Sequence, residues 1–332
     1  MEYEIAPEAG NLRFAPSAHL PTASAIPSQP SLSGAGGSYA GGVYDREAVK
    51  QPPSSGYSTN IEQLVNRYME TNKPYIYILT PCFGGLCYVD YMTSMINTLD
   101  LFRSMGLNVK LEFCGNDSLV MRARNNLVAK AMSDPLTTHI MFIDNDIKWE
   151  PISILKLLIS NKPVIGGVYP LKHFFHERLT EGENVVKSWL DKKNATPMRD
   201  FVGDTDFVEQ RLLRYNVNYL EDGKMSVENN VGEVRHIATG FLMIQRHVIE
   251  KMFTSFPSTK YTDDVSFLKP KENEFAYALF DCGVEDGHYL SEDWMFCARW
   301  RKMGGQVFID VTIDLTHIGT AKYSGCYVSS LL

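Results

Sequence analysis

The chain opens with a stretch that has no repeating hydrophobic pattern and then changes to apolar runs that alternate with helical periodicity. Strands are predicted where short apolar runs end in polar or turn-forming residues, over 74–81, 108–114, 138–144 and 162–170. Helices are predicted where apolar residues recur three and four positions apart, over 58–72, 92–105, 118–132 and 151–161. Strands that alternate with helices of this length favour parallel pairing through right-handed crossovers. The pattern therefore predicts a three-layer α/β/α sandwich with a mostly parallel central sheet.

The second half of the chain is less regular. Residues 172–232 carry many charges and few clear periods, which predicts long loops and short helices. Regular structure returns with a strand leading into a helix over 233–253, a helix over 291–305 and one or two strands over 306–319.

The pattern also divides the 332 residues into a tail and a folded part. Residues 1–56 are rich in Pro, Gly, Ser and Ala, a composition that buries too little apolar surface to fold alone. We expect a flexible tail there, either a plain linker or an arm that docks a partner. Residues 57–332 are expected to form a single domain, whose halves are 57–170 and 171–332.

Composition narrows the functional classes. The chain is 44% hydrophobic and 21% charged with a net charge of −7, which predicts a soluble globular protein and argues against nonspecific nucleic-acid binding. The six cysteines have no CxxC spacing, so we expect reduced thiols and a cytoplasmic location. There is no run of about 18 apolar residues, which predicts that the chain does not span a membrane.

The candidate chemistry lies where the predicted strands end. Asp144 and Asp146 follow a strand that looks buried on both faces, and a buried carboxylate needs a compensating partner. Oxygen ligands select hard cations such as Mg²⁺ or Mn²⁺, which makes a divalent metal one candidate partner. The alternative is that both acids are turn or capping residues before the helix at Pro151.

Three other groups have both a structural and a functional interpretation. Arg122 and Arg124 begin a helix, where they either face an anion or form a solvated surface. Glu292 and Asp293 also begin a helix, either as caps or as a general base. A lone histidine such as His317 is usually a packing residue, and it is a metal candidate only if the fold brings it to Asp146.

The order of these motifs, "ILTPCFGG", "NDSLVMRARN", "DND", "ATGFLMI", "SED" and "HIG", resembles that of glycosyltransferases of the A fold over about residues 73–320. The resemblance implies a metal-dependent enzyme that uses a nucleotide sugar. It implies a donor-binding role for Thr80, Pro81, Cys82, Asn116, Arg122, Asn125, Asp144, Asn145, Thr239 and Gly240. It also implies Asp144, Asp146 and His317 as metal ligands and Glu292 and Asp293 as the catalytic acidic pair.

The resemblance further implies a UDP-sugar donor, a Mn²⁺ or Mg²⁺ ion and a hydroxyl acceptor on a glycan. A bound cation would stabilise the charge on the departing diphosphate. Asp293 as a base would favour inversion at the sugar carbon. Asn145 replaces the central acid of some DxD motifs, and residues 172–232 match no part of the family's pattern.

Three alternatives stay open. A phosphatase of the haloacid-dehalogenase type also has Asp-x-Asp after a strand, but its motif lies at the first strand and does not place a lysine where Lys148 stands. A sugar nucleotidyltransferase would carry a basic residue in the glycine-rich loop after the first strand, and "TPCFGGLCYVD" has none. The third alternative is an inactive protein that binds nucleotide sugars or has a structural role.

Overall fold

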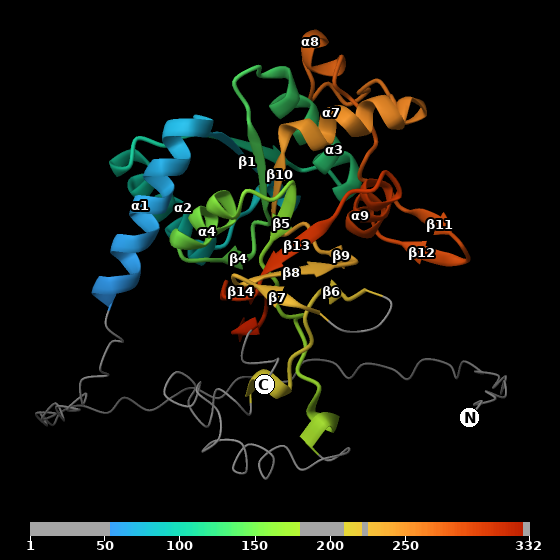
Figure 1. Ribbon diagram of the computed structural model, residues 1–332. Helices are drawn as coiled ribbons and strands as arrows, with labels where there is room; N and C mark the ends of the chain where they lie inside the picture. Colours follow the sequence, from blue (N-terminus) through green and yellow to red (C-terminus); the bar gives the residue numbers. More distant parts are fainter. Residues whose placement is uncertain (1–53, 180–208, 221–224, 328–332) are drawn as a thin grey trace, which may run out of the picture. The chain divides into compact units, whose positions relative to one another are not determined.

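The computed structural model describes residues 54–179, 209–220 and 225–327 (Figure 1). The predicted tail lies outside these ranges except for its last three residues, which begin helix α1 (Ser54–Asn72). The helix thus starts before residue 57, where folding was expected to begin. By their contacts, residues 53–332 form one unit.

The first half of the chain follows the predicted alternation closely. Its main elements are β1 (Tyr75–Cys82), α2 (Val89–Ser104), β2 (Asn108–Gly115), α3 (Val120–Ser133), β3 (His139–Ile143), β4 (Ile147–Lys148), α4 (Ile152–Ser160) and β5 (Val164–Gly166). Gly106, with φ of 69°, stands between α2 and β2, where a left-handed residue ends the helix at low cost. The short β4 was not predicted. It pairs with the strand that contains His317 and so brings this residue to those that follow β3.

The second half contains shorter elements. They are β6 (Val217–Asn218), β7 (Val227–Glu228), β8 (Val231–Val234), β9 (His236–Ile237), β10 (Phe241–Gln245), α7 (Arg246–Ser255), α8 (Pro270–Asn273), β11 (Gly283–Glu285), β12 (His288–Leu290), α9 (Glu292–Lys302), β13 (Val307–Asp310), β14 (Leu315–Ile318) and β15 (Lys322–Gly325). Among the described residues, 3₁₀ turns lie at His176–Leu179 and Pro257–Thr259 in this half and at Phe83–Gly85 in the first half. The strand predicted over 233–245 is in fact three strands that belong to different ladders.

The central sheet has eight strands in the order β2-β1-β3-β10-β5-β13-β8-β7. β1 is parallel to β2 and β3, and β13 is parallel to β5. β10 is antiparallel to both of its neighbours, and β8 is antiparallel to β13 and β7. The sheet is therefore mixed: β10 and β8 run against the other strands, which share the single direction expected from the alternation. β10 lies between β3 and β5, so both predicted halves contribute to one sheet.

Alternate residues of the central strands enter two hydrophobic clusters. Tyr77 and Phe142 join the cluster that includes α3, α7 and α9, while Ile78 and Met141 join the one that includes α1, α2 and α4. Helices thus pack against both faces of the sheet, as Figure 1 shows for α1, α2 and α4 and for α3, α7 and α9. No helix among the described residues is long and apolar enough to cross a membrane. All six cysteines are free thiols, as predicted.

Candidate functional site

The carboxylate that follows β3 is compensated by a buried arginine. Arg124 donates from Nη1 and Nη2 to the two oxygens of Asp144 at 3.0 and 3.2 Å, and from Nε to Glu292 Oε1 at 3.2 Å. The Arg124 side chain is only 5% exposed. Burial alone would lower the pKa of Arg124, but the two carboxylates outweigh it and the pKa is raised. Arg124 therefore joins α3 to the end of β3 and to the start of α9.

The backbone beside Asp144 approaches closely at Gly240. The Asp144 N–H donates to Gly240 O at 3.0 Å, and the Gly240 N–H donates to Tyr169 Oη at 3.2 Å. A Cβ on Gly240 would lie 2.5 Å from Tyr169 Oη and 2.9 Å from Asp144 Oδ2, so only glycine fits. The neighbouring Thr239 hydroxyl is buried and has no hydrogen-bond partner among the described residues.

Asp146 has a different environment, which strand pairing creates. β14 pairs with β4 in a register that sets His317 opposite Ile147, and the Ile318 N–H donates to Asp146 O at 2.8 Å. His317 Nε2 consequently lies 3.6 Å from Asp146 Oδ2. Lys172 Nζ lies 2.5 Å from the same oxygen. Burial tends to raise the pKa of Asp146, but His317 and Lys172 outweigh it and the pKa is lowered.

Two of the three predicted metal ligands fit a divalent cation. His317 Nδ1 lies 2.9 Å from Pro170 O, and because a carbonyl only accepts, the proton is assigned to Nδ1. Nε2 faces Asp146, and in the neutral imidazole it would carry the lone pair, the arrangement that metal-binding histidines adopt when a carbonyl holds the other nitrogen. Asp144 fits poorly, since Arg124 occupies both of its oxygens. Within the described ranges, no group of three or more His, Cys, Asp or Glu side chains is arranged to hold a metal.

A cleft of about 300 Å³ opens at this edge of the sheet. Its lining brings together the predicted residues Pro81, Cys82, Asp144, Asn145 and Asp146 with Phe83, Cys114, Asp117, Ser118, Val120 and Ala123. Asn145 holds the loop after β1, since its Nδ2 donates to Leu86 O at 2.6 Å. The cleft thus places both aspartates in one lining.

Several predicted donor-binding residues have other partners. Thr80 is buried and its hydroxyl lies 2.6 Å from Tyr91 Oη, while Asn125 bonds both the O and N–H of Phe280, at 2.6 and 2.9 Å. Both residues are therefore structural and lie outside the lining of the cleft. Arg122 forms a two-pronged ion pair with Asp117, at 2.8 and 2.9 Å. Asn116, with φ of 63°, is exposed near Gly85.

The two acidic residues at the start of α9, Glu292 and Asp293, have different hydrogen-bond partners. Glu292 pairs with Arg124, whereas Asp293 accepts hydrogen bonds from the Ser291 hydroxyl and, at 2.8 Å, from the Trp294 N–H. Burial, together with the neighbouring Glu292, raises the pKa of Asp293. A carboxyl group with a raised pKa is better suited than an ordinary one to accept a proton near neutral pH.

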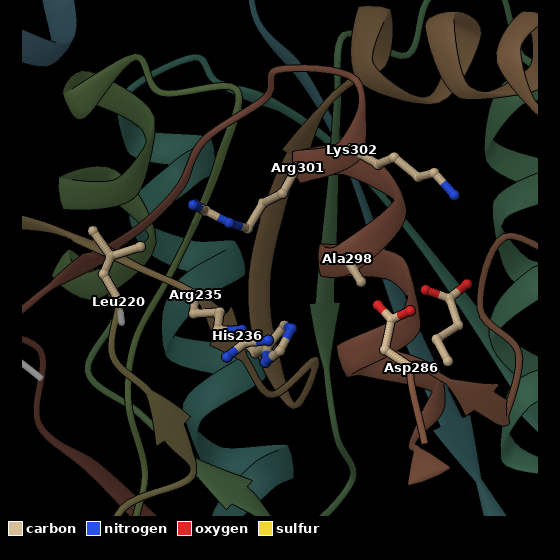
Figure 2. A pocket seen from close by; sticks show the side chains of 8 residues that line it. Leu220, Arg235, His236, Asp286, Ala298, Arg301 and Lys302 are labelled. Carbon is tan, nitrogen blue, oxygen red and sulfur yellow. The ribbon is translucent and has the colours of Figure 1, made fainter. Parts of the chain in front are cut away.

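A second hollow, of about 750 Å³, lies along α9 beyond Asp293 (Figure 2). Its lining residues are Leu220, Arg235, His236, Glu285, Asp286, Ala298, Arg301 and Lys302. An overlapping part adds Asn218, Tyr219, His288, Tyr289, Leu290 and Trp294. The His236 ring stacks on Trp294 with a centroid distance of 5.3 Å, and burial with Arg235 and Arg301 lowers the pKa of His236 to about 4. His236 is therefore neutral at neutral pH.

Sequence reasoning missed two residues of the site. Lys172 opens the charged segment that had no periodicity, so its position relative to Asp146 had no signal. Tyr169 stood in a predicted strand, but the strand ends at Gly166 and leaves Tyr169 free to support Gly240. Its ring also packs edge-on against His317, with centroids 4.9 Å apart.

Comparison with known proteins does not identify a family. No protein-family model and no curated protein matches the chain. Among solved structures, the crystal structure of A197 from STIV is similar, with a TM-score of 0.41 and 13% identity over 76% of this chain and 94% of that chain. At this TM-score the likeness carries no argument about function.

The two arginines of α3 should differ sharply in their contribution to stability. Arg124→Met leaves Asp144 and Glu292 without their cation, and we expect it to lower the free energy of unfolding by about 3–5 kcal/mol. Arg122 is 35% exposed and has one carboxylate partner, Asp117, which keeps its hydrogen bond from the Leu119 N–H, so Arg122→Met should cost less, about 1–2 kcal/mol. Urea denaturation of both variants measures the difference, and equal losses would contradict the role given to Arg124.

Proposed function

We propose that this protein is a metal-dependent glycosyltransferase of the A fold that moves a sugar from a nucleoside-diphosphate donor, with UDP favoured, to a hydroxyl acceptor. The observation that carries the proposal is the distance of 3.6 Å between Asp146 and His317, which are far apart in the sequence. This proximity was the condition under which His317 would be a ligand. A cytoplasmic location remains part of the proposal.

The cleft offers the donor Asp144, Asn145 and Asp146 at one edge, and Lys172 pairs with Asp146 from outside the lining. Asp146 and His317 would hold a divalent ion together with diphosphate oxygens, since Mg²⁺ is commonly bound by one or two carboxylates plus substrate phosphates. Such an ion would neutralise the charge that develops on the departing diphosphate. Lys172 would contribute a second positive charge near the phosphates. Arg124 keeps the Asp144 carboxylate fixed at the end of β3, beside Gly240.

Asp293 is the proposed base. Both of its hydrogen bonds from Ser291 and Trp294 reach the Oδ1 atom, and none of the described residues donates to Oδ2. Oδ2 would accept the proton of the attacking hydroxyl, and the raised pKa supports that role. Attack from the side opposite the departing diphosphate would invert the sugar carbon.

The hollow beside α9 supports a saccharide acceptor. Arg235 and Lys302 can only donate hydrogen bonds, whereas the carboxylates of Glu285 and Asp286 can only accept them. A sugar hydroxyl does both, while a phosphate would be repelled by the carboxylates. Tyr289, which is 70% exposed, adds an aromatic face. Trp294, the residue after the proposed base, lines the hollow, so an acceptor held there would lie against the same turn of α9 that carries Asp293.

Donor hydrolysis tests the proposal directly. With UDP-sugars and Mn²⁺, we expect slow release of UDP by the full chain and a loss of about 100-fold or more in Asp146→Ala, the scale of one strong electrostatic group in catalysis. Asp314→Ala is the control, since Asp314 is an exposed aspartate that lines a different hollow. Hydrolysis that survives in Asp146→Ala would remove that residue from the mechanism. Absence of hydrolysis with every donor would count against the function.

The acceptor hollow is tested by separating binding from hydrolysis. On an array of immobilised glycans, the full chain should bind at least one saccharide class, and Tyr289→Ala and Arg235→Ala should reduce that binding about tenfold, a loss of about 1.4 kcal/mol. Val284→Ala is the control, because Val284 is similarly exposed and opposes Tyr289 across the β11–β12 hairpin but does not line the hollow. Donor hydrolysis should be unchanged. No glycan binding, or equal binding by all variants, would contradict the assignment.

A further inference from the structure

Asp146 already has a cation in the protein itself. Lys172 Nζ lies 2.5 Å from Asp146 Oδ2, and the Lys172 side chain is 35% exposed. Its stem passes over Gly319, where an added Cβ would stand 3.1 Å from Lys172 Cδ. Because Gly319 follows β14, the same strand end that supplies His317 also leaves room for the lysine. The absence of a side chain at Gly319 thus leaves space for the Lys172 side chain to reach Asp146 Oδ2.

The oxygen that Lys172 occupies is the one that faces His317. His317 Nε2 is 3.6 Å from Asp146 Oδ2, and the ring is held in this orientation by Pro170 O, 2.9 Å from Nδ1. A divalent ion bound by this pair would have to contact the same Oδ2 atom. Two cations on one carboxylate oxygen repel each other strongly at such distances. The ammonium and a metal ion therefore exclude each other from Asp146.

Asp144 does not offer the metal an alternative. Both of its oxygens accept from the guanidinium of Arg124, which is also held by Glu292 and is nearly fully buried. Arginine stays charged and its planar fork is fixed, whereas lysine is a flexible point charge. Of the two cations at this edge of the sheet, Lys172 is the one that a metal ion can replace, because it pairs with a single carboxylate whereas Arg124 holds two.

We propose that Lys172 is a built-in competitor for the divalent cation: its ammonium closes Asp146 to a metal until an anionic ligand draws the ammonium away. The metal and the diphosphate of the donor then bind together, and Lys172 moves from Asp146 to the phosphates. The part played by the diphosphate rests on the proposed function. The competition at Asp146 does not, because it follows from the contacts of this chain alone.

Calorimetric titration with Mn²⁺ alone, without nucleotide, tests the competition. Lys172→Met should bind Mn²⁺ about tenfold tighter or more than the unsubstituted chain, because it removes a positive charge from the ion's position. Lys172→Arg keeps the charge and should remain weak. Lys110→Met is the matched control, since Lys110 pairs with Asp134 at 3.1 Å away from the site, and it should leave Mn²⁺ affinity unchanged.

Adding Asp146→Asn to Lys172→Met should abolish the increase in Mn²⁺ affinity, which would show that the ion binds at Asp146. Equal or weaker Mn²⁺ binding by Lys172→Met overturns the proposal, and so does the absence of Mn²⁺ binding by every variant. The outcome is separable from that of the proposed function. If donor hydrolysis persists with a chelator, the protein is a glycosyltransferase that needs no metal, and the competition between Lys172 and a metal plays no part in its activity. If Lys172→Met binds Mn²⁺ more tightly but no donor is hydrolysed, the competition at Asp146 is supported and the glycosyltransferase function is contradicted.

Discussion

The buried ion pair of Arg124 with Asp144 and Glu292 is the constraint on which the site depends. It compensates a carboxylate at the end of a fully buried strand, and a carboxylate left there without a partner would be very costly. It also fixes the start of α9 against α3. Asp293 is the next residue after Glu292, so the position of the proposed base follows from the same guanidinium.

The second aspartate differs from the first in what neutralises it. Arg124 is buried and shared by two carboxylates, whereas Lys172 is partly exposed and pairs with Asp146. The pair Asp144 and Asp146 thus combines a structural carboxylate with an exchangeable one. This division also disfavours the phosphatase alternative, in which Asp144 would have to be a free nucleophile.

Much of the fold could be predicted from the sequence because the first-half helices and strands show their periods clearly. The direction of β10 could not be predicted, since residues 172–232 precede it and carry no period that reveals the crossover. The site shows the same limit. The Asp146–His317 proximity depends on a two-residue strand, β4, which is too short to leave a pattern. Thr80 and Asn125 matched a motif, but their buried hydrogen bonds became known only from the packing.

Crystals of the full chain grown with UDP and Mn²⁺, with the manganese located by its anomalous scattering, test the central claim most directly. We expect one manganese ion bound by Asp146 and His317 and by the diphosphate, with Lys172 Nζ moved from Asp146 to a phosphate oxygen and Arg124 unmoved on Asp144. UDP or manganese bound elsewhere, with Lys172 still on Asp146, would contradict it.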